Sequence, residues 1–141
     1  ELISLPNGKL TVRWDESKMR QVLINLIANA IKFTPHGGSI TVTCSSAEGC
    51  MVEIKVIDNG IGIEDDMKEQ VFLAFEQADN SYTRIYEGVG LGLAITRSIV
   101  SLHNGRVWIE DTAGGGTTVH MIVPVDAETT KEDENAENLG C

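Results

Sequence analysis

A glycine-rich segment, Gly88-Val-Gly90-Leu-Gly92, stands directly before a predicted helix and could bind an anion. Successive backbone N–H groups at a glycine-rich helix start form a cradle for negative charge, and the helix dipole adds to their effect. The segment is not a dinucleotide fingerprint, because no strand leads directly into it. Since this spacing also occurs by chance, the segment alone indicates a candidate phosphate site and no more.

A carboxylate stands at the start of a second glycine-rich segment. Asp58 ends an apolar run and is followed by Asn59-Gly60-Ile61-Gly62. An ordinary glycine-rich turn after a strand would produce the same pattern. Asp58 is therefore a candidate binding residue whose role depends on what lies around it.

Two amides and an amine share one face of a predicted helix. Asn25, Asn29 and Lys32 fall within a narrow arc, because successive helical residues advance by about 100°. The apolar stripe of the same helix is centred on roughly the opposite side, which leaves room for a ligand. A solvated polar face explains the helix equally well when it is considered alone.

The elements that must position these residues follow from periodicity and turn signals. Some segments have apolar residues at steps of three and four, as in a helix. Between them lie short runs in which apolar and polar residues take turns, as in a strand. We expect a strand at Leu10–Trp14, a helix at Glu16–Phe33, strands at Ser39–Ser46 and Met51–Asp58, a helix at Ile63–Phe75, a polar loop at Glu76–Glu87, a helix at Gly90–His103, and strands at Arg106–Asp111 and Thr117–Val125. Paired strands beside segregated helices predict a two-layer α/β (α+β) sandwich.

Composition limits the classes of function. The chain has 141 residues and a formal net charge of −10, with 42% hydrophobic residues, as in one globular domain. An acidic chain without a basic stripe is a poor nucleic-acid binder, whereas local amides and one metal ion can hold a nucleotide. No apolar run approaches the roughly 20 residues of a membrane span. We expect a cytoplasmic domain without direct membrane contact, in a parent protein that could itself be anchored.

The last part of the chain differs in composition from the rest. Residues 126–141 contain six acidic residues and a single lysine. Such a polar, charged segment cannot bury enough apolar surface to fold alone. We therefore expect one domain over residues 1–125 and an acidic disordered tail or linker over 126–141.

Four segments in one order resemble the N box and three glycine boxes of the GHKL ATPase superfamily. They are Asn25–Lys32, Asp58–Gly62, Gly88–Gly92 and Gly114–Thr118. The residues between them are most similar to the catalytic ATP-binding domain of sensor histidine kinases. The resemblance spans roughly residues 10–124 and implies the Bergerat fold, a mixed sheet of about five strands covered on one face by three helices.

The resemblance implies roles for the polar residues of the N box. In histidine kinases the residue matching Asn29 holds Mg²⁺ through its amide oxygen, and Asn25 lies one turn away beside the phosphates. Lys32 would meet phosphate as a point charge. Asn25, Asn29 and Lys32 are thus the expected catalytic residues, and Asn29 is the expected metal ligand.

The resemblance also implies an adenine site. The residue matching Asp58 accepts a hydrogen bond from the adenine N6 amine, while Gly60 and Gly62 let the backbone approach the base. Guanine presents a carbonyl at that position, which would leave the carboxylate unpaired. Thr117 or Thr118 would support Asp58, and the sequence does not distinguish between them.

The polar loop and its glycine box resemble an ATP lid. Phe72 and Phe75 match the F box, and Arg84 is either a phosphate contact or a solvated lid residue. The expected nucleotide-binding residues are therefore Asn25, Asn29, Lys32, Asp58, Gly60, Gly62, Ile63, Phe75, Arg84, Gly88, Val89, Gly90, Leu91, Gly92, Thr117 and Thr118.

One position differs from hydrolytic relatives of the superfamily, and two others depart from the pattern of the histidine kinase family itself. Hydrolytic relatives such as DNA gyrase have glutamate where Asn25 stands, and an amide cannot act as a general base toward water. The family more often has glycine at Glu87 and threonine or serine at Val89, so the lid here lacks one hydroxyl. The first departure favours phosphoryl transfer to a side chain over hydrolysis.

The implied function is that of a protein histidine kinase domain in two-component signalling. The chain would bind Mg-ATP and transfer the γ-phosphoryl group to a histidine on a separate dimerisation domain, with a response-regulator receiver domain as an indirect partner. On its own it would turn over little. Two alternatives remain: a degenerate module that senses nucleotide or docks without phosphotransfer, and another GHKL ATPase or protein kinase.

Overall fold

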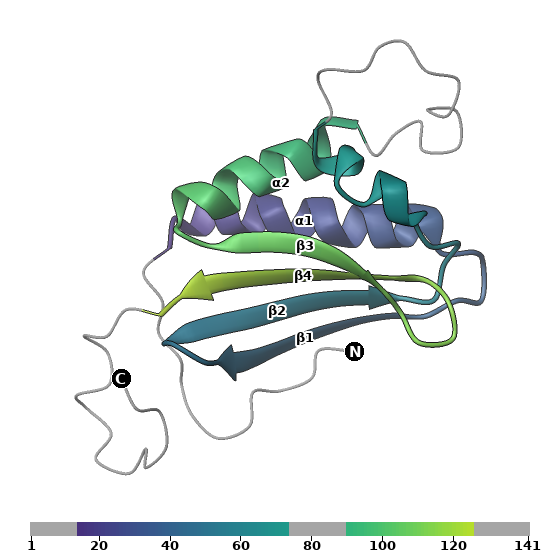
Figure 1. The fold of residues 1–141 in the computed structure, drawn as a ribbon, viewed down its shortest axis with the longest axis horizontal. Coiled ribbons are helices and arrows are strands. Elements are labelled where there is room, and N and C mark those ends of the chain that lie inside the picture. Colours follow the sequence, from purple (N-terminus) through teal and green to yellow (C-terminus); the bar gives the residue numbers. More distant parts are fainter. Residues whose placement is uncertain (1–13, 74–89, 126–141) are drawn as a thin grey trace.

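Two helices cover one face of a four-stranded sheet (Figure 1). The computed structural model describes residues 14–73 and 90–125. The sheet order is β1-β2-β4-β3, and all three pairings are antiparallel. The elements are α1 (Glu16–Phe33), β1 (Ile40–Ala47), β2 (Met51–Asp58), the 3-10 turns η1 (Asp65–Met67) and η2 (Gln70–Phe72), α2 (Gly90–Leu102), β3 (Arg106–Asp111) and β4 (Thr117–Pro124).

The two-layer α/β architecture is confirmed, together with both long helices and the two hairpins. The four described strands are antiparallel throughout. A mixed sheet would require the fifth predicted strand to pair in parallel with one of them. Of the fifth predicted strand, only Trp14 is described, and it has no regular structure. The rest of that strand, residues 74–89 and the predicted tail at 126–141 lie outside the described residues.

The segment predicted as a third helix, Ile63–Phe75, consists of two short 3-10 turns over its described part. Val71 and Phe72 are consecutive, and both are buried. The two turns are too short to present one repeating apolar face, and both side chains belong to the core between the helices and the sheet. Lys68, between the turns, forms ion pairs with Asp65 and with Asp111 of β3.

Helix α1 begins at a well-formed cap. The Asp15 side chain accepts a hydrogen bond of 3.0 Å from the Lys18 amide, which satisfies one of the free N–H groups of the first turn. The Asp15 amide in turn donates to Nε2 of His103, which follows α2. The start of α1 is therefore tied to the end of α2, and the two helices pack side by side on the sheet (Figure 1).

The core lies between the helices and the sheet. Alternation along β2 turns Val52, Ile54 and Val56 toward the helices, and Asp58 continues the same row. The buried apolar side chains are Met19, Val22, Leu26, Ala30, Val52, Ile54, Val56, Val71, Phe72, Leu93, Ile99, Val100, Val107, Ile109, Val119, Met121 and Val123. Asp58 is thus a carboxylate at the end of a row of core residues.

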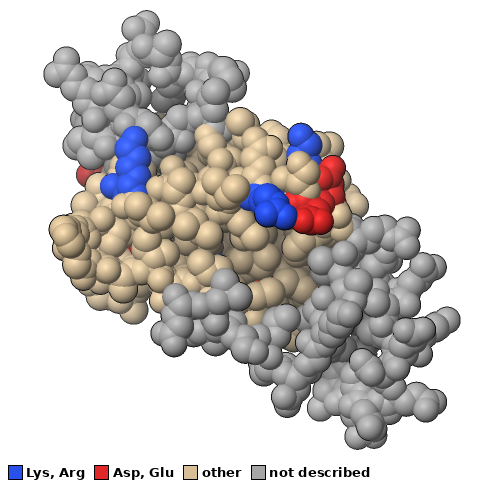
Figure 2. All heavy atoms as spheres, turned by 180° about the vertical axis from the view of Figure 1, so that it is seen from behind, with Lys and Arg blue, Asp and Glu red and all other residues tan. Residues whose placement is uncertain are grey.

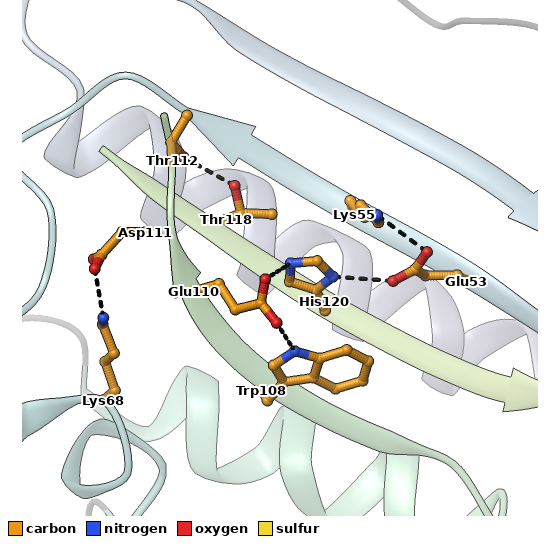
Figure 3. Close-up of polar contacts among 9 residues, drawn as sticks. All are labelled: Glu53, Lys55, Lys68, Trp108, Glu110, Asp111, Thr112, Thr118 and His120. Carbon is orange, nitrogen blue, oxygen red and sulfur yellow. Dashed lines mark hydrogen bonds and ion pairs between the residues drawn. The ribbon is translucent and has the colours of Figure 1, made fainter. Parts of the chain in front are cut away.

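The other face of the sheet carries a polar network (Figure 3). The imidazole of His120 on β4 lies between two carboxylates, with Nδ1 3.0 Å from Glu53 and Nε2 3.3 Å from Glu110. Trp108 stacks on this imidazole and donates a 2.8 Å hydrogen bond to Glu110. Burial raises the pKa of Glu53, but hydrogen bonds from His120 and Lys55 and the charge of Lys55 outweigh it, so the pKa lies below its ordinary value.

From behind, most of the described surface is uncharged, and its basic and acidic side chains stand in a few separate groups (Figure 2). Two large apolar side chains of α1, Ile24 and Ile31, are 59% and 62% exposed. No helix among residues 14–73 and 90–125 combines the length and the apolar character needed to cross a bilayer.

Candidate functional site

A pocket lies between the two helices and the sheet, beside Asp58. Most of its lining is apolar, and three polar side chains contribute to it. The lining residues are Leu26, Asn29, Ala30, Phe33, Asp58, Gly62, Ile63, Leu93, Ile109, Thr117 and Val119. A flat apolar ligand with a few polar edges fits such a lining.

The carboxylate of Asp58 is buried and held through one of its two oxygens. Oδ1 accepts hydrogen bonds from the Gly60 amide at 2.8 Å and from the Thr117 amide at 3.1 Å. Asp58 is only 6% exposed, and none of the described residues donates to Oδ2. Because Asp58 lines the pocket, this oxygen could accept a hydrogen bond from a ligand N–H.

Glycines allow the chain to pass close to Asp58. A Cβ at Gly60 would lie 2.3 Å from the carbonyl oxygen of Phe33, and one at Gly116 would lie 2.1 Å from the carbonyl oxygen of Asp58. Gly62 lines the pocket with a φ of +77°, a conformation that other residues rarely adopt. The glycine spacing therefore reflects contact between backbone segments in addition to turn formation.

Asn29 lines the same pocket from α1. Its Nδ2 atom is buried and has no hydrogen-bond partner among the described residues. Since a buried amide without a partner costs free energy, this side chain is also suited to contact a ligand. Asn29 and Asp58 thus supply the pocket with one neutral and one charged polar group.

The other two polar residues of the N box lie outside the pocket lining. Nδ2 of Asn25 donates a 3.2 Å hydrogen bond to the carbonyl of Gly92, which fastens α1 to the first turn of α2. Lys32 is exposed, with Nζ 5.7 Å from the centre of the Phe33 ring. The structure therefore groups Asn29 with Asp58 and places Asn25 and Lys32 beside them on α1.

The two threonines of the last glycine box have different positions. Thr117 lines the pocket, and its backbone amide donates to Asp58. Thr118 lies on the other face of the sheet, because side chains alternate along β4, and its hydroxyl is 2.9 Å from that of Thr112 (Figure 3). Of the two, Thr117 is the one that supports Asp58.

Only some of the remaining residues expected to bind nucleotide lie within the described part of the chain. Ile63 lines the pocket, and Gly90 begins α2 with Leu91 in its first turn. Phe75, Arg84, Gly88 and Val89 lie outside the described residues.

Sequence reasoning missed the apolar walls of the pocket. Leu26, Ala30 and Leu93 of the helices and Ile109 and Val119 of the strands line the pocket, and none of them is among the residues expected from the sequence. The signal for them was present as apolar periodicity, but the same periodicity describes every core residue. Which core residues border a cavity depends on how helices and sheet separate near Asp58.

The sequence profile of one protein family, described as histidine kinase-, DNA gyrase B- and HSP90-like ATPase, matches residues 14–127. Among curated proteins, the histidine protein kinase DivJ of Caulobacter vibrioides is 42% identical over 86% of this chain and 20% of its own length. The sensor histidine kinase WalK of Bacillus subtilis is 39% identical over 93% of this chain and 21% of its own length. The chain thus spans about a fifth of these relatives.

Among solved structures, too, the similar proteins are histidine kinases. The catalytic domain of the histidine kinase ThkA superposes with a TM-score of 0.72 at 32% identity, over 86% of this chain and 75% of that domain. Full-length ShkA in complex with AMPPNP superposes with a TM-score of 0.72 at 31% identity, over 86% of this chain and 24% of ShkA.

Proposed function

This chain belongs to the histidine kinase-, DNA gyrase B- and HSP90-like ATPase family and is homologous to histidine kinase catalytic domains, and we propose that it binds Mg-ATP and supplies the γ-phosphoryl group to a histidine on a separate domain. One observation carries the proposal: a buried carboxylate at the wall of an apolar pocket, with one oxygen held by two amides and the other without a donor among the described residues.

The purine fits the apolar part of the pocket. Leu26, Ile109 and Val119 offer apolar surface to a flat ring, and Oδ2 of Asp58 accepts a hydrogen bond from the exocyclic amine of adenine. Guanine has a carbonyl at that position and would place an oxygen against the carboxylate. Selectivity for adenine then follows, because a site that must bond a donor rejects an analogue without one.

A divalent cation would depend on an amide rather than on a carboxylate cluster. Among the described residues no group of three or more histidines, cysteines or acids could hold a metal ion. Asn29 fits Mg²⁺ through its side-chain oxygen, because its amide lines the pocket and a hard cation accepts an amide oxygen together with phosphate oxygens and waters. Its Nδ2, which has no partner among the described residues, would then be available to donate to a phosphate oxygen. When bound, Mg²⁺ would neutralise phosphate charge.

Positioning accounts for the proposed catalysis. Phosphoryl transfer requires mainly alignment and charge stabilisation. Asn25 holds α2 against α1 through Gly92 and cannot act as a base toward water. Lys32, exposed at the last turn of α1, would add positive charge near the phosphates. This arrangement favours transfer to a protein side chain over hydrolysis.

The acceptor and further partners belong to the rest of the protein. The chain spans about a fifth of its curated relatives, so a dimerisation domain with the acceptor histidine would lie elsewhere in the parent. ThkA has been solved in complex with the response regulator TrrA, and this chain is 30% identical to that ThkA. We propose a receiver domain as the indirect partner here.

Calorimetric titration with ATP and GTP, each with and without Mg²⁺, tests the proposal. We expect ATP to bind with a dissociation constant of about 1–100 µM and GTP to give no signal. Asp58→Ala should weaken ATP binding by about 10- to 100-fold, since a hydrogen bond to a charged group contributes about 1.5–3 kcal/mol. Equal binding of both nucleotides, or unchanged ATP affinity in Asp58→Ala, would contradict the proposed adenine site.

A further inference from the structure

At the end of the ladder between β1 and β2, a side-chain acceptor replaces a backbone acceptor in one hydrogen bond. Asn59 follows Asp58 and lies opposite Ser39, whose carbonyl accepts from the Asn59 amide at 3.3 Å. In a regular antiparallel pair, the Ser39 amide would donate back to the main-chain carbonyl of Asn59. It donates instead to the side-chain oxygen Oδ1 of Asn59, at 2.7 Å. The side chain therefore takes the position of a backbone acceptor.

The hydrogen bond from the Ser39 amide to the Asn59 side chain lets the backbone leave the sheet immediately after Asp58. The backbone turns at Gly60, whose amide donates to Asp58, and the next amide, that of Ile61, donates to the carbonyl of Phe33 at 3.1 Å. A ladder continued through the Asn59 carbonyl would hold the chain extended and draw Gly60 away from the carboxylate. The direction in which Asp58 points therefore depends on the bond made by Asn59.

There is no room for further side chains around the hydrogen bond between Ser39 and Asn59. A Cβ at Gly38 would lie 2.8 Å from Oδ1 of Asn59, and a Cβ at Gly116 would lie 2.6 Å from its Cα. Both neighbours are glycines, so the loop reaches Ser39 without a steric conflict. The Asn59 residue itself is exposed and does not line the pocket.

We propose that Asn59 is a positioning residue for adenine selection, which holds Asp58 in the orientation that reads the exocyclic amine by tying the loop to Ser39. This inference rests on the proposed function. Asn59 does not contact the nucleotide, and its effect passes through the Asp58–Gly60 turn. Its loss should therefore reduce discrimination by the base more than it reduces folding stability, because water can reach the Ser39 amide.

The test compares ATP with purine riboside triphosphate, which lacks the exocyclic amine. We expect wild-type protein to prefer ATP by about tenfold. Asn59→Ala should lower this ratio at least threefold, and Asn59→Gln should do the same because its oxygen lies one methylene farther out. Asn59→Asp keeps an acceptor at the same position and should retain the ratio. Ser39→Ala is the matched control, because the bond uses only its backbone.

The outcomes separate this inference from the proposed function. If wild-type protein does not distinguish the two nucleotides, the adenine site itself is refuted. If wild-type protein prefers ATP and both Asn59→Ala and Asn59→Gln keep the full ratio, Asn59 has no positioning role. Thermal unfolding of each variant shows that the protein is folded, and Asn59→Gln provides the comparison should Asn59→Ala fail to fold.

Discussion

At the scale of single residues, the site depends on close approach of backbone segments. The Gly60 and Thr117 amides both donate to Oδ1 of Asp58, which leaves Oδ2 for the proposed ligand. The strand that carries Thr117 can reach Asp58 only because Gly116 has no side chain there. The orientation of the Asp58 carboxylate thus depends on the neighbouring backbone segments as well as on its own side chain.

Gly116→Ala should destabilise the fold strongly. The new Cβ would lie 2.1 Å from the Asp58 carbonyl oxygen at a φ of +106°, so steric conflict adds to backbone strain, and we expect a loss of at least about 3 kcal/mol. The matched control is Gly114→Ala in the same turn. Gly114 has a φ of +89° and nothing within 4 Å, so strain alone should cost about 1–2 kcal/mol. Urea unfolding measures both, and equal losses would contradict the close-approach argument.

At the scale of elements, α1 has three different surfaces. One packs on the sheet through Met19, Val22 and Leu26, a second borders the pocket through Asn29, and a third exposes Ile24 and Ile31. A helix can serve all three because residues at steps of three and four share a face. The position of Asn29 at the pocket is therefore secured by the core residues one turn away.

Leu26→Ala and Ile24→Ala form a matched pair on this helix. Leu26 is 1% exposed, so its truncation should cost about 2–5 kcal/mol through lost burial and a cavity. Ile24 is 59% exposed, and its truncation should cost less than about 0.5 kcal/mol. Chemical denaturation without nucleotide measures folding stability separately from binding. A large loss in Ile24→Ala would show that the exposed face has a packing partner.

At the scale of the whole molecule, the two faces of the sheet have separate roles. Helices α1 and α2 cover one face of the sheet (Figure 1). The core and the pocket lie on that face. The opposite face joins β2, β4 and β3 through Glu53, His120 and Glu110 (Figure 3). The strands that border the pocket are thus also connected on the face away from it.

Glu53→Gln should make stability less dependent on pH in the acid range. The pKa of Glu53 is lower in the folded state, so its contribution is complete above the unfolded value of about 4.3 and is lost as pH falls through the folded value. The variant should therefore be less stable than wild type at pH 7, and the difference should shrink as pH falls below about 4.3. Denaturant titrations over this range measure it. Glu48→Gln, in the exposed turn after β1, should change stability little at any pH.

Much of this protein was determined by its sequence alone. Helical periodicity and the Asp15 cap defined α1, and glycine and asparagine signals ended the helices and separated the strands. The four glycine and asparagine boxes pointed to the family, and the family profile confirmed it. These features are local, because periods, caps and turns depend on residues only a few positions apart.

Tertiary structure decided what these local signals could not. It placed the Thr117 amide, and not the Thr118 hydroxyl, against Asp58, although 59 positions separate Thr117 from Asp58 along the chain. It turned the predicted helix before the lid into two 3-10 turns that bury Val71 and Phe72. Such outcomes depend on strand register and on contacts between distant segments, so no window of neighbouring residues contains them.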